Sequence, residues 1–265
     1  MRIRSLALTT DLALAATRGR VTDRGDYIVV ESPDDPGYYY GNLLVLPAPP
    51  QVGEVAYWTR RFGEELGHNP LIRHVTLQWD DVTGDIGAAD ELVAAGFELE
   101  VNQVMVAEEV TAPPPVLPTR ELEADDVLAT ADLAWAIGDR HDEAYRSFLH
   151  RRAEWHRTLV ARGSARFWGA FDGGQLVASL GLVELLELAR YQDVQTATAY
   201  RGRGLAGALL AIAAAASPAE RRVIVAEPNS TAARVYERVG FRTVERSASA
   251  CRYPPGVSAR SSRSR

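Results

Sequence analysis

The chain has 265 residues, of which 46% are hydrophobic and 24% are charged, and its formal net charge is -6. This length exceeds the usual size of one domain, and the composition is that of an ordinary folded protein, so we expect two globular domains. The acidic balance argues against a nucleic-acid-binding protein, which would carry a basic surface. The single cysteine, Cys251, excludes an intrachain disulfide and any cysteine-rich metal site.

Residues 1–16 begin with arginines and continue into an apolar stretch that Asp11 interrupts. This pattern predicts an amphipathic helix in preference to a signal peptide. The longest apolar run, residues 209–216, is too short to span a bilayer. We therefore expect a cytoplasmic protein that does not enter a membrane.

Residues 27–46 read as a hairpin around a turn at residues 32–37, and residues 73–77 read as a strand. A proline cluster at residues 112–118 can continue neither a helix nor a central strand, and it therefore predicts a linker. The predicted organisation is a domain at 1–111, the linker, a domain at 119–254 and a disordered tail at 255–265.

The second half alternates between helix and strand patterns. Helical spacing of apolar residues covers 125–137 and 143–160, and a hairpin with a glycine turn covers 166–180. A strand at 191–197 precedes a glycine-rich loop and a helix at 205–216. A further strand at 221–227, a helix at 230–239 and a final strand or strand pair at 241–252 complete an α/β order.

The glycine-rich loop spans residues 201–207. A pyrophosphate needs several convergent N–H donors, and the start of a helix offers unpaired amides with a favourable dipole. Glycines let the backbone approach such an anion closely. Alone, this segment is also compatible with an ordinary turn before a core helix.

A second segment removes much of that ambiguity. The run Tyr200 to Ala206 is similar to the Arg/Gln-x-x-Gly-x-Gly/Ala signature of GCN5-related N-acetyltransferases (GNAT). About thirty residues later, Asn229-x-x-Ala232 and Tyr236-x-x-x-Gly240-Phe241 resemble the second signature of this family. The likeness covers about 135 residues, and it implies binding of acetyl-CoA (coenzyme A) without a metal.

A rival motif overlaps the same loop, because Gly202-x-Gly204-x-x-Gly207 also matches the dinucleotide fingerprint and Glu227 lies about twenty residues beyond the loop. In a dinucleotide-binding unit, however, the first glycine directly follows a buried strand. Here residues 196–201 intervene, and fewer than 60 residues remain to complete a doubly wound sheet. We therefore favour the acetyltransferase reading.

The resemblance assigns roles to particular residues. Tyr236 corresponds to the tyrosine that acts as general acid, and backbone amides of the preceding strand hold the thioester and the pantetheine arm. The implied coenzyme-binding residues are Val194, Gln195, Thr196, Arg201, Gly202, Arg203, Gly204, Leu205, Ala206, Gly207 and Asn229.

The general base is less clear from the sequence. Gln192 stands where family members often carry a carboxylate, which leaves Glu184, Glu187 and Asp193 as candidates, and we take Glu187 and Asp193 as the catalytic acidic residues. Three histidines, His141, His150 and His156, fall in the helical segment that forms the acceptor side in the family. Surface positions are the default expectation for them, and their spacing indicates no metal site.

The first half repeats part of this pattern without its chemistry. Residues 92–97 parallel residues 236–241, and residues 73–77 parallel residues 221–225, but Leu92 stands in place of the tyrosine. The segment at 47–53, where a coenzyme loop would be, is rich in proline, which has no N–H to offer a phosphate. Chance similarity between ordinary αβ segments is the alternative explanation.

These observations predict an α/β fold of two tandem GNAT-like domains, each a mixed, mostly antiparallel sheet flanked by helices. The predicted activity is transfer of an acetyl or short acyl group from acetyl-CoA to a primary amine of a small molecule or peptide. The alternative is a non-catalytic acyl-CoA-binding or scaffolding protein. We expect no nucleic-acid or membrane partner, and either a monomer that forms an internal pseudo-dimer or a homodimer.

Overall fold

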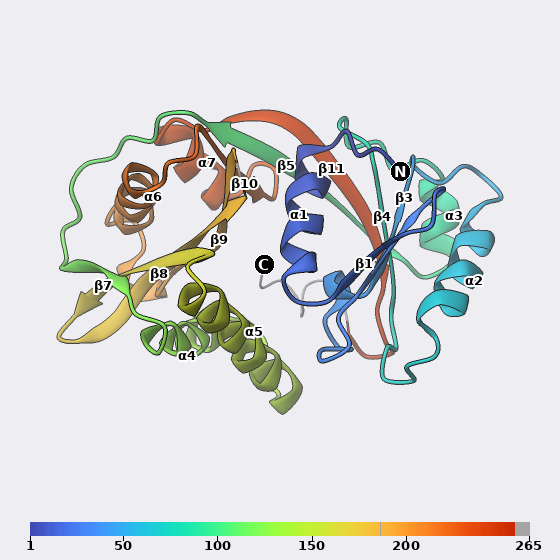
Figure 1. The fold of residues 1–265 in the computed structure, drawn as a ribbon, viewed down its shortest axis with the longest axis horizontal. Helices are drawn as coiled ribbons and strands as arrows, with labels where there is room; N and C mark the ends of the chain where they lie inside the picture. Colours follow the sequence, from blue (N-terminus) through green and yellow to red (C-terminus); the bar gives the residue numbers. More distant parts are fainter. Residues whose placement is uncertain (186, 258–265) are drawn as a thin grey trace. The chain divides into compact units, whose positions relative to one another are not determined.

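A computed structural model describes residues 1–185 and 187–257 of the chain (Figure 1). The described residues form two compact units. Of the described residues, unit 1 comprises Met1–Val104 and Val244–Val257, and unit 2 comprises Met105–Thr243. Each unit has a hydrophobic core of its own. Most of the predicted tail, residues 258–265, lies outside the described residues.

Unit 1 is built on a mixed sheet with the strand order β1-β2-β3-β4-β11-β5. The pairs β1–β2, β2–β3 and β4–β11 are antiparallel, and β3–β4 is parallel. The strands are β1 (Arg20–Asp23), β2 (Ile28–Glu31), β3 (Leu43–Leu46), β4 (Val75–Trp79), the first part of β5 (Glu98–Ala107) and most of β11 (Arg242–Arg252). The helices are α1 (Leu6–Ala16), α2 (Val55–Leu66), α3 (Ala89–Ala94) and the short 3-10 helix η1 (Tyr39–Gly41).

The core of unit 1 follows the alternation of side chains along β2 and β3. On one face, a cluster with α1 contains Leu8, Ile28, Val30, Leu43 and Val45. On the other face, a larger cluster with α2 and α3 includes Leu44, Leu46, Phe62, Leu77 and Trp79. Burial of each such side chain contributes about 1.5–3 kcal/mol. Both faces of these strands are thus apolar, as expected for strands that helices cover on both sides.

Unit 2 has the strand order β5-β10-β9-β8-β7-β6. The pairs β6–β7, β7–β8 and β8–β9 are antiparallel, and β9–β10 is parallel. The strands are the end of β5, β6 (Thr119–Leu122), β7 (Ala165–Asp172), β8 (Gln175–Leu185), β9 (Leu188–Thr196) and β10 (Arg221–Ala226). The helices are α4 (Ala129–Ile137), α5 (Glu143–Ala161), α6 (Leu205–Ala216) and α7 (Thr231–Arg238), with 3-10 helices η2 (Asp126–Leu128) and η3 (Thr198–Tyr200).

Helices cover both faces of the unit 2 sheet. In Figure 1, α4 and α5 lie on one side of β8 and β9, and α6 lies on the other. Tyr191 of β9 belongs to the α6 side, because its hydroxyl donates a hydrogen bond of 2.7 Å to the carbonyl of Leu210. Phe167 of β7 belongs to the α5 side, because its ring packs 4.8 Å from that of His156. The two sides therefore have different chemistry, since His156 is polar and the α6 side is almost wholly apolar.

The two units share one chain topology. In unit 1, three antiparallel strands lead through α2 to a parallel strand, then α3 and a last strand. In unit 2, β7, β8 and β9 lead through α6 to β10, then α7 and a last strand. The predicted α/β fold of two tandem halves, with mixed, mostly antiparallel strands and flanking helices, is confirmed.

The last strand of each half is exchanged. β11 follows α7 in sequence, yet its residues 249–252 pair antiparallel with Val75–Gln78 of β4 in unit 1. β5 closes the first half of the sequence, yet Met105 and Ala107 at its end lie in the core of unit 2. Each compact unit thus includes a strand from the other half of the sequence, and the domain bounds 1–111 and 119–254 remain a prediction. Strand patterns reveal that a strand exists, but its partner is set by contacts distant in sequence.

Three strands, β1, β5 and β6, have no counterpart in the sequence prediction. β1 and β6 have four residues each, and each lies at an edge of its sheet with mostly exposed or half-exposed side chains. Short edge strands of this kind lack the apolar alternation that identifies a strand. The predicted helix at 205–216 and the predicted hairpin at 166–180 agree with α6 and with β7–β8. No helix in the described ranges is both long and apolar enough to cross a membrane.

Candidate active site

The glycine-rich loop lies between η3 and the first turn of α6, where the sequence places it. Gly202 has φ of 76° and Gly204, the N-cap residue of α6, has φ of 77°. Both values lie in the left-handed region, where glycine carries no steric penalty. A Cβ atom built on either glycine would meet nothing within 4 Å. The backbone at this turn is therefore open to a ligand.

The amides of this turn are unpaired. In the described part of the chain, no N–H of residues 202–207 donates a hydrogen bond, and the first paired amide is that of Ala208, which donates to Gly204. Orphan amides at a helix start, together with the helix dipole, form an anion-binding site. The Arg201 and Arg203 side chains bond to the carbonyls of Thr196 and Ala199, which keeps two positive charges beside the turn.

Two residues of the predicted loop have a packing role as well. The side chain of Leu205 is buried in the core, so only its amide is available to a ligand. A Cβ atom on Gly207 would lie 3.1 Å from Val239 Cγ1, so glycine allows α6 to approach the chain beyond α7. Ala206 is half-buried.

The parallel strands β9 and β10 separate beside this loop. Only Leu188–Arg190 pair with Arg221–Val223, although β9 continues to Thr196. On the other edge of β9, the amide of Ala197 donates to Val177 of β8. Because amides alternate along a strand, those of Val194 and Thr196 point toward the β10 side. The divergence therefore leaves strand amides free to bind an acyl carbonyl or a pantetheine amide.

A bulge in β9 accompanies this divergence. The register passes from Ser179↔Gln195 to Gly181↔Gln192, so β9 carries one extra residue at this point. Asp193 lies in the bulge with φ of 48°, a left-handed conformation that is uncommon outside glycine and asparagine.

The carboxylate of Asp193 is held from α5. Its Oδ2 lies 3.1 Å from Arg152 Nε and 3.5 Å from His156 Nδ1. All three side chains are less than 10% exposed. A buried ion pair of this kind is costly to break from one side, by about 3–5 kcal/mol. The pair therefore holds the bulge in place, and proton abstraction by Asp193 would have to compete with Arg152.

The other predicted polar residues are more distant or more exposed. Glu187 is exposed in the turn between β8 and β9, six residues from Asp193 and thus about 20 Å away along the strand. The structure does not bring Glu187 together with the loop. Asn229 lies in the turn after β10 with φ of 60°, and its side chain is exposed. Ser230 beside it caps α7 by accepting a hydrogen bond from the amide of Ala233.

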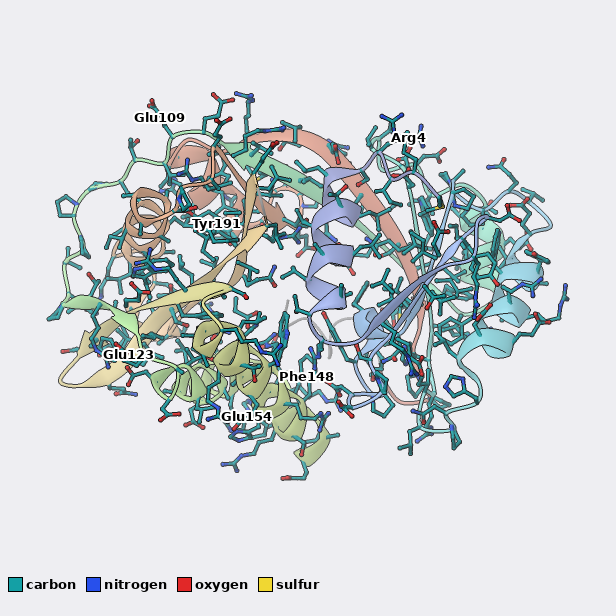
Figure 2. All side chains as sticks on the ribbon, viewed as in Figure 1. Arg4, Glu109, Glu123, Phe148, Glu154 and Tyr191 are labelled. Atoms are coloured by element: carbon teal, nitrogen blue, oxygen red, sulfur yellow. The ribbon has the colours of Figure 1, made fainter. Side chains whose placement is uncertain are left out.

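Tyr236 lies on the buried side of α7. It is 6% exposed, its ring packs against Phe241, and Phe241 in turn packs edge-on against Tyr191 of β9. Figure 2 marks Tyr191 among the strands of unit 2. The Tyr236 hydroxyl makes no hydrogen bond to any described residue. Burial raises the pKa of this hydroxyl well above its usual value, so it stays protonated.

This protonation state defines what Tyr236 can do. A phenol with the reference pKa of about 10 is a weaker acid than a thiol at about 8.5, so complete transfer of its proton to a thiolate is uphill by about 2 kcal/mol. Burial increases that difference. Tyr236 is therefore suited to donate a hydrogen bond to a developing thiolate, which is stabilised as the C–S bond breaks.

The corresponding region of unit 1 is closed. β3 and β4 remain paired to Leu46 at the end of β3, and the amide of Asp80 continues the ladder by donating to Leu46. At the start of α2, the amides of Gln51 and Gly53 donate to the carboxylates of Glu54 and Glu91. The protein's own carboxylates thus occupy the places that phosphate oxygens would need.

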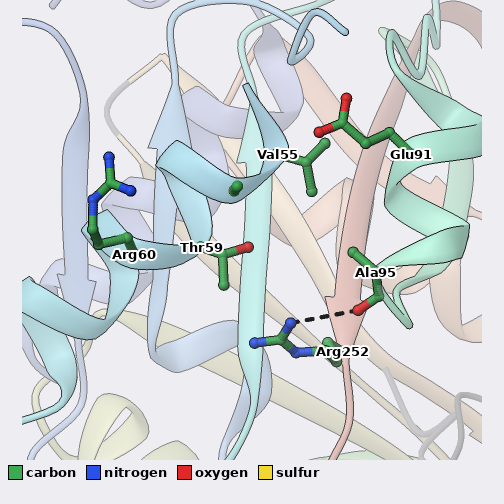
Figure 3. A pocket seen from close by; sticks show the side chains of 7 residues that line it. Val55, Thr59, Arg60, Glu91, Ala95 and Arg252 are labelled. Carbon is green, nitrogen blue, oxygen red and sulfur yellow. Dashed lines mark hydrogen bonds between the residues drawn. The ribbon is translucent and has the colours of Figure 1, made fainter. Parts of the chain in front are cut away.

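Unit 1 has a cavity of about 360 Å³ nearby, between α2, α3 and the end of β11 (Figure 3). Its walls are mostly apolar, and Arg252 crosses it to donate a hydrogen bond of 3.4 Å to the carbonyl of Ala95. The cavity lies in the unit without a glycine-rich turn, so it does not mark the coenzyme site.

Sequence reasoning missed the polar side of β8 and β9. Ser179, Arg152 and Gln195 are all buried on the side of the sheet that α5 covers, and no separate sequence signal marks Ser179 or Arg152. The expectation of a surface position is wrong for His156, which is 1% exposed between Phe167 and the Asp193 carboxylate, whereas His141 and His150 are exposed. Within the described residues, no group of three or more metal-binding side chains is found.

Comparisons with known proteins agree with this geometry. Residues 136–251 match the family model of the acetyltransferase (GNAT) domain. No curated protein gives a significant match to the chain.

Three solved structures share the fold at low identity. A functionally unknown conserved protein from Staphylococcus epidermidis ATCC 12228 aligns over 88% of this chain and 94% of its own, with a TM-score of 0.73 and 11% identity. A GCN5-related N-acetyltransferase from Kribbella flavida aligns over 95% of each chain, with a TM-score of 0.66 and 13% identity. A tandem GNAT protein from the clavulanic acid biosynthesis pathway aligns over 82% of this chain and 76% of its own, with a TM-score of 0.53 and 14% identity. The match to the family model, the open amide-lined turn and the shared tandem fold together identify residues 136–251 as an acetyltransferase domain of the GNAT family.

Proposed function

We propose that the protein transfers an acetyl or other short acyl group from acetyl-CoA to a primary amine of a small molecule or peptide. The observation that carries this proposal is the combination, in unit 2, of the unpaired amides at residues 202–207 with the divergence of β9 from β10. An anion site alone would fit many phosphorylated ligands. The adjoining row of free strand amides fits one with a long amide-containing arm that ends in a thioester.

The residues present fit coenzyme A. The amides at the start of α6, with Arg201 and Arg203 beside them, would hold the pyrophosphate, and charge-assisted hydrogen bonds of this kind contribute about 1.5–3 kcal/mol each. The amides of Val194 and Thr196 would hold the acyl carbonyl and the pantetheine arm. Asn229, exposed at the end of β10, would contact the arm from the opposite strand.

The reaction forms a C–N bond and breaks a C–S bond. The neutral amine nitrogen attacks the acyl carbon, amides of β9 stabilise the negative charge that develops on the carbonyl oxygen, and the electron pair of the broken bond leaves on sulfur. Tyr236 donates a hydrogen bond to that sulfur, and the proton lost by the amine passes to water and finally to the thiolate. Asp193 is the nearer of the two predicted acidic residues, and its ion pair with Arg152 favours a role in holding the bulge.

The same ion pair is the observation that favours a second candidate function. If acyl transfer required a free carboxylate base at Asp193, the pairing with Arg152 would leave a protein that binds acyl-CoA without turnover. In either case unit 1 has a supporting role, as part of an internal pseudo-dimer or of a homodimer, in a cytoplasmic protein without a nucleic-acid or membrane partner.

Release of free thiol from acetyl-CoA, measured over a panel of primary amines, tests the proposal. We expect amine-dependent thiol release together with an acetylated amine by mass spectrometry. Tight coenzyme binding without thiol release for any amine would favour the non-catalytic binding function over the acetyltransferase function. Failure to bind acetyl-CoA would overturn both.

A further inference from the structure

The buried polar pair formed by Ser179 of β8 and Gln195 of β9 stands out on the α5 side of unit 2. The two residues are directly opposite each other in the β8–β9 register. Ser179 is 1% exposed and Gln195 is 7% exposed. The Ser179 hydroxyl and the Gln195 Oε1 atom have no hydrogen-bond partner among the described residues.

The face of the sheet to which this pair belongs follows from the register. Gly181 is opposite Phe167, and a Cβ atom on Gly181 would lie within 2.3 Å of the Phe167 ring, so the two share a face. Phe167 packs on His156 of α5. Ser179, two residues from Gly181 on β8, shares that face, and Gln195 opposite it shares the face too. The pair therefore lies on the same side as the Arg152–Asp193 ion pair.

The pair is also next to the proposed acyl site. Gln195 stands between Val194 and Thr196, whose amides point into the divergence between β9 and β10. In a β-strand the side chains point out of the sheet, about perpendicular to the backbone amides of the two neighbouring residues, which lie in the sheet. An acyl carbon held by those amides would thus have the Gln195 side chain on one side of it, the direction from which a nucleophile can approach.

Buried polar atoms in folded proteins nearly always have partners, so the unpaired Ser179 hydroxyl and the unpaired Gln195 oxygen each destabilise the fold unless a ligand bonds to them. We propose that Ser179 and Gln195 bind the amino group of the acceptor, with the Gln195 oxygen and the Ser179 hydroxyl oxygen accepting its two N–H bonds. Neither residue takes the proton. A neutral primary amine fits this pair because it offers two N–H donors and keeps its lone pair for the acyl carbon.

This assignment predicts a preference for primary over secondary and tertiary amines as acceptors. A primary amine satisfies both oxygens, whereas a secondary amine satisfies one of them, and a tertiary amine satisfies none. The inference rests on the proposed function, because the pair needs an acyl group beside it to act as an acceptor site.

Binding of two compounds to the full chain tests the proposal without requiring turnover. The first is coenzyme A, and the second is a coenzyme A derivative whose sulfur carries a CH2–C(=O)–NH2 group, which places a nitrogen with two N–H donors where the acceptor nitrogen would lie. Calorimetry gives both affinities for the wild type, for Gln195→Met and Ser179→Ala, and for the control Gln175→Met, which makes the same change at an exposed position of β8.

We expect Gln195→Met and Ser179→Ala to lose at least about tenfold in affinity for the derivative, with coenzyme A affinity within about twofold of wild type. Their melting temperatures without ligand should be equal to or above that of the wild type, because a buried orphan atom has been removed. The control should match the wild type in all three measurements.

Undiminished affinity for the derivative in both variants would overturn the proposal and leave the acetyltransferase function standing. A melting temperature that falls by many degrees would also overturn it, since the polar atoms would then be needed for folding. A wild-type chain that binds neither compound would refute the proposed function, and this inference with it.

Discussion

Gly204→Val is the substitution whose effect follows most directly from the geometry of the coenzyme turn. Gly204 has φ of 77° at the N-cap of α6, and a left-handed conformation costs a residue with a side chain about 1–2 kcal/mol, with more for a β-branched one. No atom lies within 4 Å of the added Cβ, so the unliganded fold has room for it. The stability change should therefore be a few degrees in melting temperature.

The loss in coenzyme binding should be much larger. If the strained turn relaxes, the amides of residues 205–207 no longer converge, and loss of two charge-assisted hydrogen bonds of about 1.5–3 kcal/mol each amounts to about 3–6 kcal/mol. The predicted weakening of acetyl-CoA binding is at least about 100-fold. Calorimetric titration of the folded variant measures it.

Gly163→Val is a matched control for this substitution. Gly163 follows α5 with φ of 69°, and a Cβ atom there also meets nothing within 4 Å. The two variants should lose similar stability, but only Gly204→Val should lose coenzyme affinity. Near-normal affinity in Gly204→Val, or an equal loss in both variants, would refute the assignment of this turn as the phosphate site.

Three further predictions concern other parts of the chain. Tyr236→Phe should lower kcat at least about tenfold while acetyl-CoA affinity stays within a few-fold, because the change removes the hydrogen-bond donor to the developing thiolate and keeps the ring. Unchanged kcat would remove Tyr236 from catalysis. The fragment 116–265 should be poorly soluble or unable to use an acceptor, because it lacks the core residues Met105 and Ala107 and leaves β11 without its partner β4. Co-expression of residues 1–115 should restore solubility. A soluble fragment with full activity would contradict a supporting role for unit 1. Burial lowers the pKa of His74 to about 4, below its unfolded value of about 6.5. The free energy of unfolding should therefore fall by up to about 3 kcal/mol as the pH drops from 6.5 to 4. In denaturant titrations, His74→Leu should remove this part of the pH dependence.

Local signals in the sequence predict much of this fold. The helix at residues 205–216, the hairpin around residues 173–174 and the left-handed glycines of the coenzyme turn are each set by nearby residues, through apolar periodicity and backbone freedom. The same is true of the proline-rich segment at 47–53, which predicts that unit 1 has no phosphate turn.

Other features depend on contacts between distant segments. The exchange of β5 and β11 depends on which strands pair in the folded protein, and the residue pattern of neither strand predicts its pairing partner. The bulge at Asp193 cannot be predicted from the local sequence either, because it depends on contacts with Arg152 and His156 of α5. The closure of unit 1 by Glu91 is also a tertiary effect, since this residue is 38 positions from the Gly53 amide that it binds.

Of the two similarly folded units, we expect only unit 2 to bind coenzyme. Unit 2 offers unpaired amides at residues 202–207 and separated strands, whereas unit 1 keeps β3 and β4 paired and fills its helix start with Glu54 and Glu91. Calorimetric titration of the full chain with acetyl-CoA tests this directly. We expect one coenzyme bound per chain, and a stoichiometry of two, or no binding, would refute this division between the units.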